Sequence, residues 1–165
     1  MFKDKIIIGA IIGLLADALK LTTNYIFFTF GFTKVVFWQI VATRFLKKEY
    51  LHHKSAYLIG AIADMAVSSL LGVVFVYVIY LFGSKNLWTK GLGFGLVVWV
   101  SLFGTLLGQT VEDKLPQEPT GLVVTIVAHI VFGLALALFT KVLDQNKLVP
   151  IKRNKLMRTY KSKGE

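Results

Sequence analysis

Four ionisable side chains lie well inside long apolar runs of the sequence. They are Asp17 and Lys20 in the first run, Asp64 in the second and His129 in the last. A charge near the centre of a bilayer costs about 2.5–3.5 kcal/mol on insertion scales, so such residues need a partner or a function. Lys20 follows Asp17 by one helical turn and can pair with it, and an imidazole beside a carboxylate can exchange a proton near neutral pH. These residues could therefore bind a proton, an ion or a small polar molecule.

Other polar side chains share helix faces with these four. Residues three or four apart lie on the same face of a helix, which groups Ser68 with Asp64 and Thr125 with His129. The candidate binding residues on these faces are Asp17, Lys20, Asn24, Asp64, Ser68, Thr105, Gln109, Thr125 and His129. If the apolar runs cross the membrane in alternating directions, most of these residues fall in the half nearer to residues 111–118. The spacing thus predicts a polar cluster in one half of the membrane.

This cluster has two interpretations, which the sequence leaves open. In one, it is an internal network in which Asp17 pairs with Lys20, and His129 hydrogen-bonds to Asp64 or Thr125. In the other, it lines a polar cavity that opens to one side. A metal site is not predicted, because no close HxxxH or ExxH spacing accompanies His129. A hydrolase is a weaker alternative, since no nucleophile elbow or phosphate loop is present, and we expect no enzyme activity and no cofactor.

The composition requires membrane-spanning helices to position these residues. Of the 165 residues, 55% are hydrophobic and only 17% are charged, against about 25% charged in soluble domains. This excludes a soluble enzyme and an intrinsically disordered chain, and the absence of Cys excludes a disulfide scaffold. A span needs about 20 mostly apolar residues. We predict an all-α polytopic membrane protein with one bundle, residues 1–144, and spans at about 6–30, 56–82, 87–109 and 119–143.

The segment after the first span is ambiguous. Residues 33–48 have an apolar core of about a dozen residues, which is too short to span upright, so we predict a short interfacial or re-entrant helix there. The alternative is a turn near residues 22–24 and a further span at 25–46, which would give five spans. The distribution of Lys and Arg favours four spans in a cell membrane with both termini in the cytoplasm, because the basic tail, residues 145–165, then lies inside.

Glycines at four-residue spacing mark faces for close helix packing. Gly91 and Gly95 form one GxxxG pair, and Gly104 and Gly108 form another. Through these faces we predict a homo-oligomer, in addition to contact with the lipid bilayer. The net charge is +10, but much of the excess lies in the tail, and no aromatic or Gly-rich RNA-binding motif accompanies it, so we expect no nucleic-acid binding.

Four segments carry a resemblance to known membrane proteins. They are Ile8–Gly13, Leu70–Tyr77, Leu87–Gly95 and Ala128–Ala137. With these segments the chain resembles small multi-span membrane proteins of bacteria, especially Firmicutes, and more distantly the YagU/YqhR-type inner-membrane proteins, over about residues 6–144. The resemblance implies four spans with an irregular segment after the first, and it implies no activity and no residue roles.

Two functions are compatible with these features. The first is a small transporter or channel-like protein that uses the polar cluster to bind a small polar ligand or an ion. The alternative is a non-catalytic structural or regulatory membrane protein that binds lipid or a protein partner, with the cluster as internal support.

Overall fold

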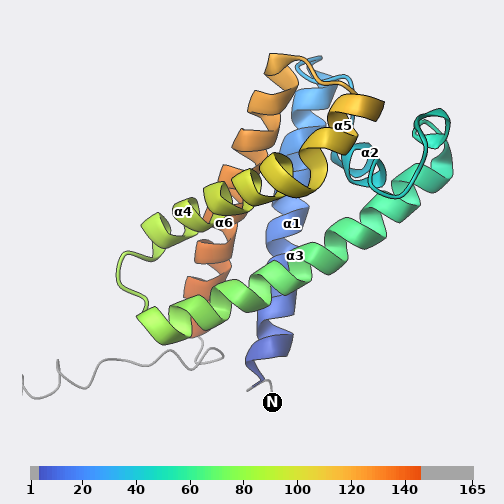
Figure 1. Cartoon of the computed structure of the whole chain (residues 1–165). Coiled ribbons are helices and arrows are strands. Elements are labelled where there is room, and N and C mark those ends of the chain that lie inside the picture. Colours follow the sequence, from blue (N-terminus) through green and yellow to red (C-terminus); the bar gives the residue numbers. More distant parts are fainter. Residues whose placement is uncertain (1–3, 146–165) are drawn as a thin grey trace, which may run out of the picture.

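The protein is an all-α bundle with four long apolar helices (Figure 1), as seen in a computed structural model that describes residues 4–145. The long elements are α1 (Lys5–Thr29), α3 (Lys54–Phe82), α4 (Leu87–Ser101) and α6 (Pro119–Gln145). A π-helical segment, η2 (Leu102–Leu107), and a further short helix, α5 (Gly108–Lys114), follow α4 directly and complete the third span. The prediction of four spans is therefore confirmed, and the chain is a membrane protein. The third span runs to Lys114, beyond the predicted end at residue 109.

The helix ends follow from local chemistry. Asp4 precedes α1, and its side chain accepts a hydrogen bond from the Ile6 amide at 2.8 Å, which satisfies one of the free N–H groups of the first turn. Gly31 and Gly83 follow the ends of α1 and α3 with φ of 78° and 77°, a region that favours glycine. Pro119 opens α6, where its missing N–H costs no helical hydrogen bond.

The helices pack through backbone contacts between small residues. α1 lies against both α3 and α6, and α4 lies against α6. A Cβ added at Gly13 would meet the Ser68 carbonyl of α3, and one added at Gly95 would meet the His129 carbonyl of α6. The face formed by Gly91 and Gly95 is therefore occupied within the chain. A homo-oligomer stays a prediction, and it would have to use other surfaces.

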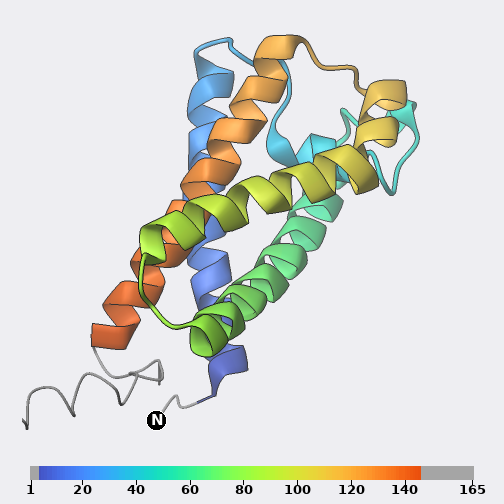
Figure 2. The ribbon, with the colours of Figure 1, turned by 60° about the vertical axis from the view of Figure 1, so that its left-hand side comes forward.

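The short helix α2 (Phe37–Ala42) packs against the first part of α3. The two helices lie side by side in both views (Figures 1 and 2), and a Cβ added at Gly60 of α3 would meet the Trp38 carbonyl of α2. Its side chains Phe37 and Ile40 are buried in an apolar cluster with Phe103 and Leu107 of η2. This burial makes α2 a re-entrant helix. It is shorter than the predicted element at residues 33–48, because turns and a 3-10 turn, η1 (Lys48–Tyr50), complete the segment.

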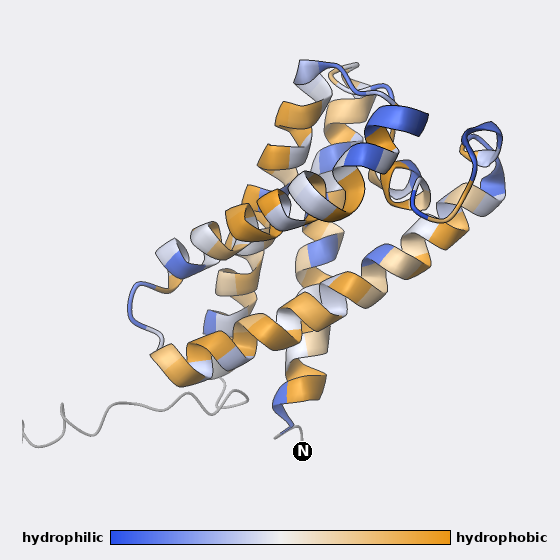
Figure 3. Cartoon of the chain, viewed as in Figure 1, coloured by the Kyte–Doolittle hydropathy of each residue, from blue (hydrophilic) through white to orange (hydrophobic). Residues whose placement is uncertain are grey.

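The outer surface of the bundle is apolar along its length. Large side chains such as Leu58, Leu70 and Val97 are each 63% exposed. The hydrophilic residues gather at the loops, with a few inside the helices (Figure 3). This distribution suits a lipid environment. Of the basic tail predicted at residues 145–165, Gln145 ends α6 and the rest lies outside the described residues.

Candidate functional site

A buried ammonium group lies between two carboxylates in the interior of the bundle. Lys20 Nζ of α1 is 2.7 Å from Asp17 Oδ1 of the same helix and 2.6 Å from Asp64 Oδ1 of α3. The three residues are 3%, 1% and 5% exposed, respectively. The predicted pair of Asp17 and Lys20 is thus present, and Asp64 joins it to form a three-residue charge cluster. This cluster links α1 to α3 ionically.

The charge cluster carries more negative than positive groups. Ser68 of α3 donates a hydrogen bond to Asp17 Oδ1 at 2.9 Å, so Asp17 has two partners on one oxygen. The other oxygen of Asp64, Oδ2, is buried and has no hydrogen-bond partner among residues 4–145. Buried polar atoms are usually satisfied. Because Oδ2 has no hydrogen-bond partner, Asp64 is the residue of the cluster that can still accept a proton or coordinate a cation.

Two aromatic rings enclose the ammonium group of Lys20. Its Nζ lies 4.3 Å from the centre of the Phe37 ring and 5.6 Å from that of Phe132. Such contacts stabilise a cation through the negative face of the ring. Phe37 belongs to α2, so the re-entrant helix covers the charge cluster. Neither aromatic residue could be predicted from spacing, because Phe37 reaches Lys20 through the folding of α2 over α1, and Phe132 through the packing of α6 beside α1.

Asn24 holds the re-entrant helix in this position. Its Oδ1 accepts a hydrogen bond from the Phe37 amide at 2.9 Å, which caps the start of α2 from the neighbouring helix α1. Since an amide N–H can only donate, this bond also fixes the orientation of the Asn24 side chain and makes the other atom Nδ2. Two predicted site residues of α1, Lys20 and Asn24, are therefore both in contact with Phe37.

His129 belongs to a separate hydrogen-bonded chain beside the charge cluster. Its Nδ1 lies 2.8 Å from the Thr125 carbonyl oxygen, and because a carbonyl only accepts, Nδ1 carries the proton. The Thr125 hydroxyl in turn accepts a hydrogen bond from Trp99 Nε1 at 2.9 Å. The His129 ring packs against Phe37 and Phe103, with centroids 5.6 and 5.8 Å apart. Of the two partners predicted for His129, the structure has Thr125.

The remaining two candidates, Thr105 and Gln109, are not part of this arrangement. Both are exposed on the third span, and the Thr105 hydroxyl donates to the Ser101 carbonyl of its own helix turn. Ser101, one turn before Thr105 on the same face, is exposed too, so this face of the third span points away from the charge cluster. In residues 4–145, no group of three His, Asp or Glu side chains is arranged to hold a metal ion.

A pocket of about 170 Å³ reaches the charge cluster from the side of the bundle. It lies between α2, α3 and η2, and Asp64 and Phe37 line it at the inner end. Its remaining wall is mostly apolar, with Arg44 following α2, and Val67 and Leu106 are exposed. The pocket thus reaches the Asp64 side chain from the outer surface of the bundle, and the Oδ2 atom itself is buried.

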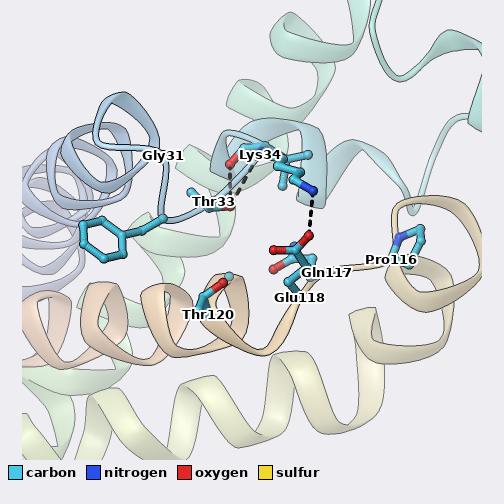
Figure 4. A pocket seen from close by; sticks show the side chains of 10 residues that line it. Gly31, Thr33, Lys34, Pro116, Gln117, Glu118 and Thr120 are labelled. Carbon is cyan, nitrogen blue, oxygen red and sulfur yellow. Dashed lines mark hydrogen bonds and ion pairs between the residues drawn. The ribbon is translucent and has the colours of Figure 1, made fainter.

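A second, smaller pocket of about 90 Å³ lies between the loops that follow α1 and precede α6. Lys34 and Glu118 point toward one another there (Figure 4), with Nζ and Oε1 2.6 Å apart. The hydrogen bond and the negative charge of Glu118 raise the pKa of Lys34 above its ordinary 10.5. Both side chains are largely exposed, so this ion pair joins two surface loops and is not a binding site in itself.

No protein-family model matches the chain, and no curated protein or solved structure matches it either. The resemblance to YagU/YqhR-type proteins stays a prediction.

Proposed function

We propose that this membrane protein is a small transporter or channel-like protein in which Asp64 binds a proton or a monovalent cation. The observation that supports this proposal is the unequal charge cluster, in which Asp17 and Asp64 share one ammonium group and Asp64 Oδ2 has no partner. Ionisable residues in membrane spans are rare and mark ion pathways and proton relays. An additional positive charge on Asp64 would balance the cluster.

The geometry also supplies a response to that charge. Lys20 bonds to both carboxylates, and one of them, Asp17, lies on its own helix. When Asp64 is neutralised, Lys20 keeps Asp17 as its partner, and the ionic link between α1 and α3 is lost. Phe37 of α2 rests on Lys20 and lines the lateral pocket. Binding at Asp64 would therefore change the contacts of α2, the helix that covers the site.

The test is ion flux through purified protein in liposomes. Proton flux would be followed with an internal pH-sensitive dye, and Na⁺ and K⁺ gradients would be applied in separate arms. We expect flux above that of empty liposomes, and we expect Asp64→Asn to abolish it. Asp113→Asn is the matched control, because it makes the same chemical change on an exposed residue of α5, and it should retain flux. Wild-type flux equal to empty liposomes for all three ions would refute the proposal.

One observation favours the alternative of a non-catalytic structural or regulatory protein. Lys20 is almost fully enclosed by two carboxylates and two aromatic rings, as expected for a group that holds helices together. Under this alternative no ion is transported, and Asp64→Asn lowers the melting temperature strongly. Little change in melting temperature with complete loss of flux favours the transporter, because functional groups are often retained at a cost in stability.

A further inference from the structure

Lys114, the last residue of α5, holds the end of α2 against the third span. Its Nζ donates hydrogen bonds to the carbonyl oxygens of Thr43 at 2.7 Å and Leu46 at 3.0 Å. These residues follow the last residue of α2, Ala42, where a helix leaves carbonyl groups without partners of its own. A lysine can satisfy such carbonyls, and here it comes from a different span. The Thr43 hydroxyl adds a longer hydrogen bond, of 3.4 Å, to that of Thr110 in α5.

These hydrogen bonds join two walls of the lateral pocket that reaches Asp64. One wall consists of α2 and the residues that follow it, and it includes Val41 and Phe45. Another wall belongs to η2, and α5 begins directly where η2 ends. Lys114 therefore ties the end of one wall to the continuation of the other.

The wall formed by α2 is the one that can move. The pocket ends at Asp64, but Oδ2 of this residue is buried, so an ion can reach it only when a wall is displaced. α2 has six residues and lies between turns, and short segments of this kind open at a lower free energy than long packed helices. Its start is fixed by Asn24 and by the close contact with Gly60, whereas its end is bonded to Lys114.

We propose that Lys114 is the latch of the lateral pocket. While its ammonium group bonds to the carbonyls that follow α2, the pocket stays narrow. When these bonds are released, the end of α2 moves away from the third span about its fixed start, and Asp64 becomes accessible from the side of the bundle. Lys114 is thus a positioning residue that acts through α2. The inference rests on the proposed function, in which Asp64 binds the ion, but access to Asp64 can be measured without transport.

A second lysine of the third span provides a matched control. Lys90 of α4 donates hydrogen bonds to the carbonyl oxygens of Phe82 at 3.1 Å and Gly83 at 2.6 Å, at the end of α3. It lies near the opposite end of the span from Lys114, and it does not line the lateral pocket. Lys90→Met therefore removes an equivalent pair of hydrogen bonds without touching α2.

The experiment measures access to Asp64 with dicyclohexylcarbodiimide, an apolar reagent that enters from the lipid and adds to a protonated carboxyl group. Protein in liposomes would be treated at one fixed pH, and the mass of the peptide that contains Asp64 would give the labelling rate, with Asp64→Asn as the background. We expect Lys114→Met to be labelled at least tenfold faster than wild type. Tenfold corresponds to about 1.4 kcal/mol, no more than one hydrogen bond to a charged group contributes.

Two variants should keep the wild-type labelling rate. Lys114→Arg retains a charged donor for the carbonyls, and Lys90→Met leaves α2 in place. Lys114→Met and Lys90→Met should have similar melting temperatures, so a difference in labelling between them reports on the pocket. Equal labelling of Lys114→Met and wild type, at any level, would overturn the latch. Faster labelling of Lys114→Arg or Lys90→Met would overturn it too.

Hydrogen exchange of the wild-type protein decides the matter if Lys114→Met loses its helix content. The amides of residues 43–46 should then exchange faster than that of Phe37, because the end of α2 opens while its start is fixed, and slower exchange at 43–46 would overturn the latch. Flux separates this inference from the proposed function. Labelling that depends on Lys114, without any ion flux, would refute the transporter and support the latch, and flux with labelling independent of Lys114 would do the reverse.

Discussion

Replacing Gly95 by Ala tests the close packing of α4 against α6. The added Cβ would lie on the His129 carbonyl oxygen, and 3.1 Å from Gly133 Cα. Favourable contacts between carbon atoms lie at about 3.5–4.0 Å, so the two helices must move apart. Neither obstacle is the flexible end of a side chain, since both are helix backbone. Overpacking of this kind costs about 1–3 kcal/mol.

Gly93 provides the matched control in the same helix. A Cβ added there meets nothing within 4 Å, so Gly93→Ala gains only the helix propensity of Ala over Gly, about 0.5–1 kcal/mol. Both variants share this gain, and the difference between them isolates the packing cost. Gly95→Ala should therefore unfold more easily than Gly93→Ala by about 1–3 kcal/mol.

The measurement is the free energy of unfolding in mixed micelles, with SDS as the denaturant and helix content or Trp fluorescence as the signal. Gly93→Ala should be slightly more stable than wild type, and Gly95→Ala less stable. Equal stability of the two variants would refute the packing described for α4 and α6. It would also mean that the Gly91–Gly95 face is available for contact with a second chain.

Three further changes test the site and its supports. Lys20→Met leaves buried carboxylates without a cation and should lower the free energy of unfolding in micelles by about 3–5 kcal/mol. Adding Asp64→Asn should recover part of this loss. A double variant no more stable than the single one would contradict the charge cluster. Asn24→Ala leaves the buried Phe37 amide at the start of α2 without its acceptor, which should lower the free energy of unfolding by about 1–3 kcal/mol. Hydrogen exchange should increase in α2 but not at the centre of α6. Unchanged exchange in α2 would argue against the cap. The pKa of Lys34 is raised above its ordinary 10.5 by Glu118, so the ion pair adds stability below pH 10.5 and loses it as the pH rises through the raised value. Glu118→Gln should therefore melt slightly below wild type at pH 8, with the difference vanishing at strongly alkaline pH, and a difference independent of pH would exclude this assignment.

The four spans could be predicted because each is a long apolar run with a clear boundary. The contact between Asp17 and Lys20 could also be predicted, since a spacing of three residues within one helix brings two side chains to the same face. Asp64 is different. Its depth in the membrane follows from its position in the second span, but depth does not determine which helix lies beside it.

The position of α2 could not be predicted, because it is determined by residues far from it in the sequence. A helix of six residues has no apolar periodicity of its own to read, and its cap comes from Asn24, 13 residues before Phe37. The orientation of the third span has the same limitation. Helical spacing groups Thr105 and Gln109 on one face, but it does not show whether that face turns toward the other helices, and both residues are exposed.

The pairing of Lys20 with Asp17 bears on how the chain enters the membrane during synthesis. α1 precedes α3 in the chain, so it is presented to the insertion machinery before Asp64 is. Two isolated charges near its middle would each oppose insertion by about 2.5–3.5 kcal/mol. Because Asp17 and Lys20 lie one turn apart and form an ion pair within α1, the helix can enter with no net charge from this pair. Asp64 then enters with α3 and binds the Lys20 ammonium as its second carboxylate. The ion pair that links the two helices therefore forms only when both are in the bilayer.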